Sequence, residues 1–177
     1  MAPVGSPRPR PAAGATRDED GVVADSVPLY TPRLVLTPAT DADVPDLVGH
    51  YRDPDVRRFL WDGVEVDDAA VAEAVRAAGE ARPGIGLWVI REREDGPLEG
   101  SCGTRTNGEE VELVVSLARQ RWGRGWATEA ARAVLDHATA HGVRQVMGYV
   151  DEGNDASARL LRRLGGTGGP HRWTLTS

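Results

Sequence analysis

The sequence predicts a strand, a turn with two glycines and a long helix, in that order, between residues 109 and 142. The alternating apolar pattern of residues 109–119 predicts the strand. Its two faces carry Val111, Leu113, Val115 and Leu117 on one side, and Glu112, Val114 and Ser116 on the other. Apolar residues then recur at helical spacing over residues 127–138, and Gly142 is placed to cap the end of that helix. Because residues 144–150 form the next strand pattern, we expect a right-handed crossover between two parallel strands.

The segment before residue 85 reads as mainly helical. A short strand pattern at residues 34–36 leads to Thr40, which is placed as the N-cap of a helix. That helix is expected to break at Asp53–Pro54 and to be followed by a short second one. Asp67 is then placed to begin a third helix, which the Pro83–Gly84 sequence ends.

The remaining patterns complete the predicted fold. Period-two patterns at residues 86–94 and 98–106 predict strands that form an antiparallel meander with residues 109–119. After the crossover, we expect a helix at residues 154–163 and one last strand at residues 171–177. This order predicts an α+β fold: a mixed, mostly antiparallel sheet with a central parallel strand pair and flanking helices.

The sequence predicts an N-terminal tail followed by one domain, which we expect to be cytoplasmic. Residues 1–28 are rich in Pro, Gly, Ala and Arg without periodicity, which predicts a disordered tail, and we expect residues 29–177 to form the domain. No apolar run approaches the roughly 20 residues of a membrane span, and no secretory signal pattern is present, so we expect no membrane association. The net charge of −6 disfavours nucleic acid as a partner, since a phosphate backbone selects a basic surface.

The cysteine, lysine and histidine patterns exclude several kinds of site. Cys102 is the one cysteine of the chain, so no internal disulfide can form, and we expect it to be buried on a strand. All 21 basic residues are arginine, which excludes a lysine nucleophile and a P-loop lysine. His137 and His141 share a helix but lack the glutamate of a zinc-protease motif, and we expect no metal site.

Gly123 and Gly125 lie where the predicted strand turns into the long helix. A helix N-terminus presents unpaired N–H groups and a partial positive charge, and a phosphate can reach them where side chains do not obstruct it. Arg119, Arg121 and Arg124 bring positive charge to the same turn. The pattern predicts a diphosphate site built from backbone N–H groups, and the alternative is a tight turn that binds nothing.

Two stretches of the sequence resemble the core of the GNAT superfamily of acyl-CoA N-acyltransferases. They are VELVVSLARQRWGRGWATEAARAVLDHA at residues 111–138 and VMGYVDEGNDASARLLRRLGG at residues 146–166. Within the superfamily, the chain is most similar to the subgroup that contains the Rim-type ribosomal-protein N-terminal acetyltransferases, which TPRLVLTPATDADVPDL at residues 31–47 also resembles. The resemblance covers residues 31–177. It implies the three-layer GNAT fold, acetyl-CoA as co-substrate and an amine acceptor.

The resemblance also implies which residues hold the coenzyme. The loop that binds the CoA diphosphate through backbone N–H groups is matched by Gly123, Arg124, Gly125, Trp126, Ala127 and Thr128. Trp122 and Trp126 flank this loop and either cover the coenzyme or pack beneath it. The strand along which the pantetheine arm runs is matched by Val115, Ser116 and Leu117. Asn154 matches an asparagine that hydrogen-bonds the arm.

Four residues are candidates for the chemistry and for acceptor binding. Glu112 matches an acidic position and could be the general base for the amine, the alternative being a solvated strand glutamate. Ser157 matches a serine near the thioester sulfur and could protonate the leaving thiol, the alternative being a helix cap. Trp61 is a candidate acceptor-side wall and Asp62 could attract a cationic amine, while both could equally anchor their loop.

Three departures from the family pattern concern the acceptor side. Leu161 stands where many members place a tyrosine general acid, and Gly166 replaces an aromatic residue. After the last helix, the chain has room for one good strand, whereas the family normally ends in a pair. The predicted function is acetyl transfer to a primary amine, which belongs to a protein N-terminus or to a small molecule. The amine is expected to attack the thioester directly in a ternary complex. The enzyme is expected to be a monomer or a homodimer. The alternatives are a non-catalytic CoA-binding or regulatory module and an interaction domain that binds no coenzyme.

Overall fold

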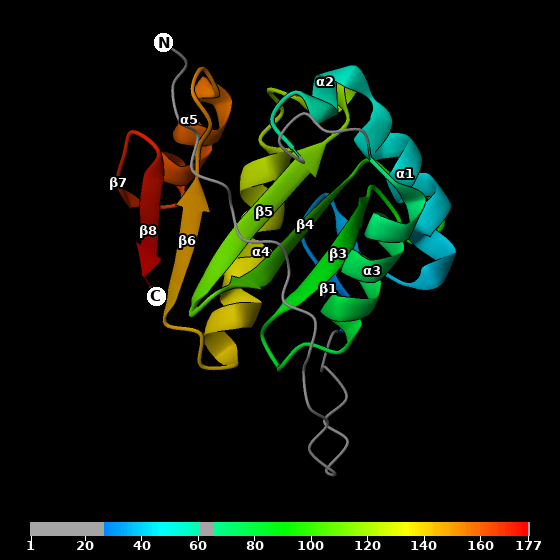
Figure 1. Cartoon of the computed structure of the whole chain (residues 1–177), viewed down its shortest axis with the longest axis horizontal. Coiled ribbons are helices and arrows are strands. Elements are labelled where there is room, and N and C mark those ends of the chain that lie inside the picture. Colours follow the sequence, from blue (N-terminus) through cyan, green and yellow to red (C-terminus); the bar gives the residue numbers. More distant parts are fainter. Residues whose placement is uncertain (1–26, 61–65, 177) are drawn as a thin grey trace.

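The computed structural model describes residues 27–60 and 66–176. Their backbone forms one eight-stranded sheet in the order β1-β2-β3-β4-β5-β6-β8-β7, with helices packed on it (Figure 1). Neighbouring strands are antiparallel except for β5 and β6, which are parallel. The predicted α+β fold with a central parallel pair is therefore confirmed. Residues 1–26 of the predicted tail lie outside the described residues, as do Trp61 and Asp62.

The first half of the domain supplies two strands and the helices of one face. The elements are β1 (Leu29–Tyr30), β2 (Val35–Pro38), a 3-10 turn (Asp41–Asp43), α1 (Val44–Arg52), α2 (Pro54–Arg57) and α3 (Asp68–Gly79). The helix starts use side-chain caps: Thr40 donates its backbone N–H to the Asp43 carboxylate, and Asp67 accepts the N–H of Ala69. The predicted break at Asp53–Pro54 is confirmed, and Asp53 caps α2 through the N–H of Asp55.

The second half forms the rest of the sheet. Its elements are β3 (Gly86–Arg91), β4 (Gly100–Asn107), β5 (Glu110–Leu117), a 3-10 turn (Arg119–Arg121), α4 (Trp126–Ala140), β6 (Gln145–Tyr149), α5 (Asp155–Arg163), β7 (Thr167–Gly168) and β8 (Arg172–Thr176). The expectation of a single strand after α5 is wrong, since β7 pairs with β8 through Thr167 and Gly168. A strand of two residues has no detectable periodicity, so its pairing can be found only in the folded chain. The same holds for β1, which pairs with β2.

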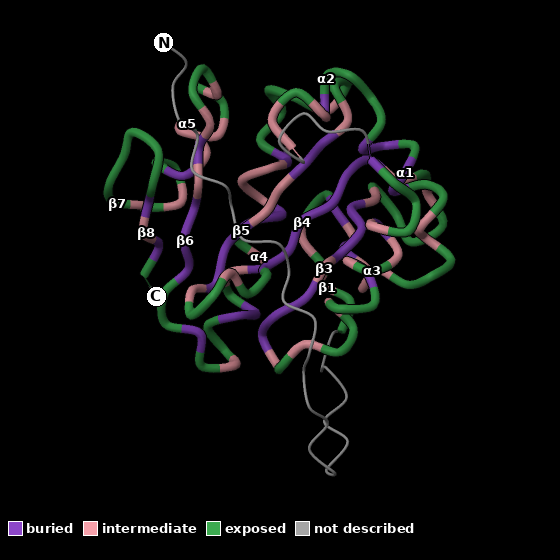
Figure 2. Tube along the Cα trace, in the orientation of Figure 1, coloured by how far each residue is buried: buried purple, intermediate pink, exposed green. Residues whose placement is uncertain are grey.

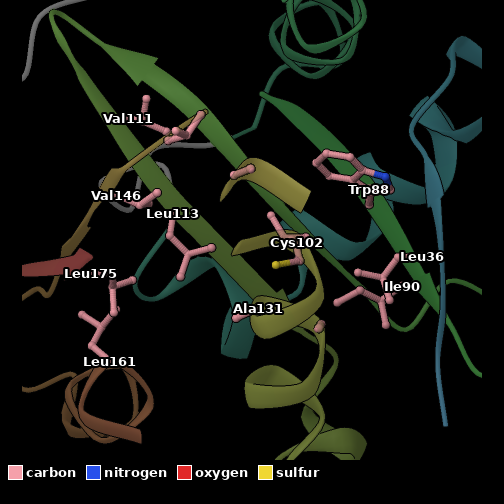
Figure 3. Packing of buried hydrophobic residues seen from close by; sticks show 14 of the residues in the cluster. Leu36, Trp88, Ile90, Cys102, Val111, Leu113, Ala131, Val146, Leu161 and Leu175 are labelled. Atoms are coloured by element: carbon pink, nitrogen blue, oxygen red, sulfur yellow. The ribbon is translucent and has the colours of Figure 1, made fainter. Parts of the chain in front are cut away.

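The sheet has an apolar layer on each face, because alternate residues of a strand point to opposite sides. On one face, Trp88 and Ile90 of β3 join the α4 residues Ala131 and Val134 in a fully buried cluster. Cys102 belongs to that cluster, and Figure 3 shows it directed toward the helix that carries Ala131. The expected burial of Cys102 is confirmed.

The opposite face is covered by α1 and α3. Val89 of β3 packs there with Leu47 of α1 and Val71 of α3, all three fully buried. Figure 2 shows buried residues concentrated along the central strands, while the outer faces of the helices and the β7 end are exposed. None of the helices found in residues 27–60 and 66–176 has the length and hydrophobicity that crossing a bilayer requires.

Candidate functional site

The parallel strands β5 and β6 are paired at one position and then separate. Glu112 lies opposite Met147, and no further pair joins the two strands among the described residues. Figure 1 shows the strands diverging toward their C-terminal ends. On its other edge, β5 remains paired with β4 up to Leu117, which lies opposite Gly100. The β6-facing edge of the second half of β5 therefore presents backbone groups that no neighbouring strand uses, which is where an extended ligand can add as a strand.

The glycine turn lies directly beyond this open edge. Gly123 and Gly125 adopt φ angles of 71° and 80°, in the left-handed region that glycine enters without steric strain. Gly125 is the N-cap of α4. A Cβ atom built on Gly123 would meet nothing within 4 Å, so this side of the turn is open. Residues 122–125 are exposed.

A run of backbone N–H groups at this turn has no internal acceptor. Among the described residues, no hydrogen bond is donated by the N–H groups of residues 123–128, whereas the N–H of Trp122 bonds the Arg119 carbonyl and that of Glu129 bonds the Gly125 carbonyl. A helix by itself leaves its first N–H groups unsatisfied, and the preceding turn extends that run. The arrangement can bind an anion through several backbone donors at once.

The three arginines around the turn differ in what they contact. The Arg121 guanidinium lies 2.6 Å from the buried Glu99 carboxylate and stacks over the Trp126 ring at 4.4 Å. Arg119 pairs with the Asp55 carboxylate at 3.1 Å. Arg124 makes no ion pair within the described part of the chain. The expectation that all three arginines supply positive charge is thus weakened for Arg119 and Arg121, whose charges are compensated.

The two tryptophans of the turn also differ. Trp126 is 4 % exposed and belongs to the core beneath the turn, while Trp122 is 46 % exposed. The Trp122 indole N–H donates to the Leu117 carbonyl at 2.8 Å and so joins the turn to the end of β5. Trp126 therefore packs beneath the turn. Trp122 lies on the surface, where its ring can cover a ligand.

The side chains of Val115, Ser116 and Leu117, which match the pantetheine strand, point to the two faces of the sheet and not along the open edge of β5. Leu117 is buried in the α4-side cluster and Val115 packs against it. The Ser116 hydroxyl points to the other face and contacts α1. These residues can therefore serve a ligand through their main chain. Further along, Ala127 packs against the core and Thr128 is half-buried in the first turn of α4.

Glu112 is buried on the face that α1 and α3 cover. It is 5 % exposed, and its Oε2 atom accepts hydrogen bonds from the Arg105 guanidinium at 3.1 Å and from Asn107 at 3.4 Å. The alternative reading of a solvated glutamate is therefore wrong. Burial and an arginine partner keep this carboxylate in a fixed place beside the position where β5 and β6 separate.

Tyr149 is a polar residue of β6 that the sequence analysis did not select. Its hydroxyl donates to the Glu110 carboxylate at 2.5 Å, and Arg172 binds the same carboxylate. The hydrogen bond to Glu110 raises the pKa of the Tyr149 phenol. Tyr149 follows Met147 by two residues, so both lie on the face that carries Glu112. A tyrosine in a short strand ordinarily reads as a packing residue, which is why sequence reasoning passed over it.

Ser157 and Asn154 lie together at the start of α5. Asn154 is the N-cap, and its Oδ1 atom accepts the Ser157 N–H at 3.1 Å. The cap is therefore Asn154 rather than Ser157. Leu161 of the same helix packs over Gly148 within the α4-side cluster, so α5 and Glu112 belong to opposite faces of the sheet. The structure thus places Ser157 and Glu112 on either side of the diverging strands.

A buried polar chain lies on the α1 side of β5. His50 Nε2 is 2.9 Å from the Ser116 hydroxyl, which is 2.9 Å from the Ser101 hydroxyl, which in turn is 2.8 Å from the Tyr51 hydroxyl. His50 also borders a shallow hollow of about 370 Å³ that reaches Gln120, just before the glycine turn. His50 and Tyr51 follow the buried Leu47 of α1 by three and four residues. This helical spacing is the sequence signal for their burial.

Other features concern metals and cavities. A second hollow of about 450 Å³ lies between the C-terminal half of α4 and β8 and includes none of the candidate site residues. Within the described ranges, no group of three or more His, Cys, Asp or Glu side chains could hold a metal ion. The absence of a metal site stays a prediction.

Known proteins are similar to this chain in sequence and in fold. Residues 33–167 match the family described as the acetyltransferase (GNAT) domain. An uncharacterized protein of Bacillus subtilis, YkkB, is 32 % identical over 145 residues, which cover 77 % of this chain and 83 % of that protein. The uncharacterized N-acetyltransferase p20 of Bacillus licheniformis is 25 % identical over 144 residues, 77 % of this chain and 80 % of that protein.

Solved structures agree with these sequence matches. An acetyltransferase from Agrobacterium tumefaciens superposes with a TM-score of 0.69 at 27 % identity, over 83 % of this chain and 91 % of that chain. A probable GNAT-family acetyltransferase from Chromobacterium violaceum has a TM-score of 0.70 at 19 % identity, over 95 % of this chain and 97 % of that one, and shows likeness of fold. The sequence, the strand order and the open parallel pair lead to one assignment: the chain belongs to the GNAT family of acetyltransferases.

Proposed function

We propose that this chain is an N-acetyltransferase that moves an acetyl group from acetyl-CoA to a primary amine. The observation that carries the proposal is the run of N–H groups over residues 123–128 without internal acceptors, next to the open edge of β5. Family membership supports the acetyl donor, and the name of the N-acetyltransferase p20 supports transfer to nitrogen. The resemblance to the Rim-type subgroup supports protein N-termini as acceptors beside small-molecule amines.

The proposed coenzyme site consists of three parts. The N–H groups of residues 123–128 would hold the diphosphate, with the exposed Arg124 and Trp122 beside it. The main chain of residues 115–117 would pair with the pantetheine arm. The Asn154 amide nitrogen, which makes no hydrogen bond among the described residues, would donate to the same arm. Small residues at the turn fit this role, since a Cβ on Gly123 would project into open space.

The proposed chemistry uses one residue from each face of the sheet. Acetyl-CoA supplies the thioester, and the acceptor amine attacks its carbonyl directly, so the buried Cys102 is not needed as a nucleophile. Glu112 would accept the proton of the amine, and Ser157 would donate a proton to the leaving thiol. Backbone N–H groups where β5 and β6 separate would stabilise the oxyanion. Holding both substrates together contributes several kcal/mol of rate acceleration on its own.

Residues that could contact the acceptor lie in two parts of the chain. Trp61 and Asp62 remain candidates in a loop outside the described residues. The described part offers Tyr149 and the ion-paired Glu110 and Arg172 on the same face as Glu112. Paired charges of both signs suit an acceptor that carries its own polar groups. The cytoplasm, a monomer or homodimer, and no role for nucleic acid remain predictions from the sequence.

Calorimetric titration with acetyl-CoA followed by a thiol-release assay tests the proposal. The amine panel contains peptides with different N-terminal residues, diamines and aminoglycosides. We expect saturable binding of acetyl-CoA and thiol release with at least one amine. Binding without turnover across the panel would favour the non-catalytic module instead. No heat of binding at all would overturn the proposed coenzyme site and favour an interaction domain.

A further inference from the structure

The turn between β1 and β2 is bonded to the first turn of α4. Arg33 donates from Nε to Oε2 of Glu129 at 2.8 Å, and its backbone N–H donates to Oε1 of the same carboxylate at 2.9 Å. The Thr31 hydroxyl also donates to Oε1 at 2.6 Å. Glu129 is thus held by donors from one short segment that lies more than 90 residues earlier in the chain.

Arg33 also reaches the glycine turn itself. Its Nη1 atom donates to the Arg124 carbonyl at 2.9 Å. In a trans peptide, the C=O and the following N–H point in opposite directions. By holding the Arg124 carbonyl, Arg33 therefore directs the Gly125 N–H away from itself and toward the open side of the turn.

The two charges of this cluster compensate each other, so that Glu129 does not oppose an anion at the turn. Glu129 lies in the first turn of α4, where its carboxylate would repel a diphosphate bound to the neighbouring N–H groups. Arg33 compensates that charge through an ion pair of 2.6 Å. Burial acts to raise the pKa of Glu129, but the hydrogen bonds from Thr31 and Arg33 outweigh it, so that the carboxyl keeps its charge and its place.

We propose, on the basis of the proposed coenzyme site, that Arg33 is a positioning residue for the coenzyme diphosphate. It orients the Gly125 N–H through the Arg124 carbonyl and removes the repulsion of Glu129. Arg33 lies outside the glycine motif, in the β1–β2 turn, and its guanidinium packs beside Gly125, where an added Cβ would lie 3.5 Å from Nη2.

The test compares coenzyme fragments that differ in their phosphates. Dissociation constants of acetyl-CoA, 3′-dephospho-acetyl-CoA and S-acetyl-pantetheine are measured for the wild type and Arg33→Gln. S-acetyl-pantetheine carries the thioester arm without the diphosphate. We expect Arg33→Gln to weaken both acetyl-CoA and its dephospho form about tenfold, the scale of one charge-assisted hydrogen bond. Binding of S-acetyl-pantetheine should stay unchanged.

Two further variants separate positioning from structural damage. Arg33→Lys keeps the positive charge but has one donor nitrogen in place of three, and it should restore part of the lost affinity for acetyl-CoA. Arg132→Gln is a matched control, because Arg132 also donates to a carbonyl, that of Arg163, at 3.2 Å but away from the turn. It should leave all three constants unchanged.

Each remaining outcome overturns the inference in a recognisable way. Equal weakening of all three ligands by Arg33→Gln would show general damage to the fold rather than positioning of the diphosphate. Weakening that disappears with the dephospho form would show that Arg33 binds the 3′-phosphate. If the wild type binds none of the three ligands, the proposed function itself fails, and this result is distinct from a failure confined to Arg33.

Discussion

The imidazole of His50 and the hydroxyl of Ser116 are hydrogen-bonded inside the molecule, at 2.9 Å and 66 residues apart in sequence. The contact joins α1 to β5, the strand along which we propose that the coenzyme arm runs. Burial lowers the pKa of His50 from 6.5 to about 4, although the nearby Asp53 acts in the opposite direction. His50 is therefore neutral at pH 7 and can accept from, or donate to, Ser116.

Stability should fall as the pH drops through the window between 6.5 and about 4. In that window the unfolded chain binds a proton at His50 and the folded chain does not, so the free energy of unfolding decreases by up to about 3 kcal/mol at the acid end. His50→Gln, which keeps an amide for Ser116, should remove this contribution. Urea unfolding of both proteins at pH 7 and pH 5 measures it. The exposed His171 serves as the control. If His171→Gln changed the pH dependence of the free energy of unfolding as much as His50→Gln does, the assignment to His50 would be contradicted.

Gly125→Ala should abolish binding of acetyl-CoA while the domain stays folded. The methyl group would strain a backbone with φ of 80°, and relief of that strain would turn the Gly125 N–H out of the proposed diphosphate site. Gly142→Ala is the matched control: φ is 84° at the other end of α4, with nothing within 4 Å of an added Cβ. Both changes should cost about 1–2 kcal/mol of stability by the same backbone strain. Thermal shift and calorimetry should show lost affinity for Gly125→Ala alone, and equal affinities for the two variants would count against the proposed site.

Glu112→Gln should lower turnover about 10²- to 10⁴-fold with little change in the KM for acetyl-CoA, since a general base acts on the amine rather than on the coenzyme. Gln keeps the shape and an acceptor for Arg105, which limits the structural effect. Glu109→Gln, an exposed neighbour on the preceding turn, is the control and should keep full activity. Steady-state thiol release with an amine that gives turnover measures both constants. Unchanged turnover in Glu112→Gln would remove Glu112 from the mechanism.

Gly148→Ala should destabilise the fold, because the added Cβ would lie 2.5 Å from a Leu161 methyl group. Overpacking of this kind costs about 1–3 kcal/mol. Leu161→Ala should cost about 2–5 kcal/mol by leaving a cavity in the core. In the double variant the new methyl fills part of that cavity, so its loss of stability should be smaller than the sum of the two. Denaturant unfolding of the four proteins gives the coupling energy, and strict additivity would show that the two side chains do not share the space.

The amino-acid sequence by itself determined the order of the elements. Apolar residues with a period of two identify β3, β4 and β5, because that period places them on one face of a strand. A period of 3.6 identifies α4, because it places them on one face of a helix. The same local rules located the helix break at Asp53–Pro54, the helix start at Asp67 and the glycine turn before α4. These are properties of neighbouring residues, so they can be read without knowing where the rest of the chain lies.

Only the tertiary structure decided which distant residues meet. The bonds of Arg33 with Glu129 and of His50 with Ser116 span 96 and 66 residues, and no periodicity connects their members. The pairing of β7 and the separation of β5 from β6 after Glu112 are likewise set by packing. Whether a charged side chain is solvated, paired or aimed at a ligand depends on the long-range contacts around it, since the energy of a charge is set by its surroundings. For that reason Glu112 and Arg121 could be selected from the sequence, but their burial and their ion pairs could not.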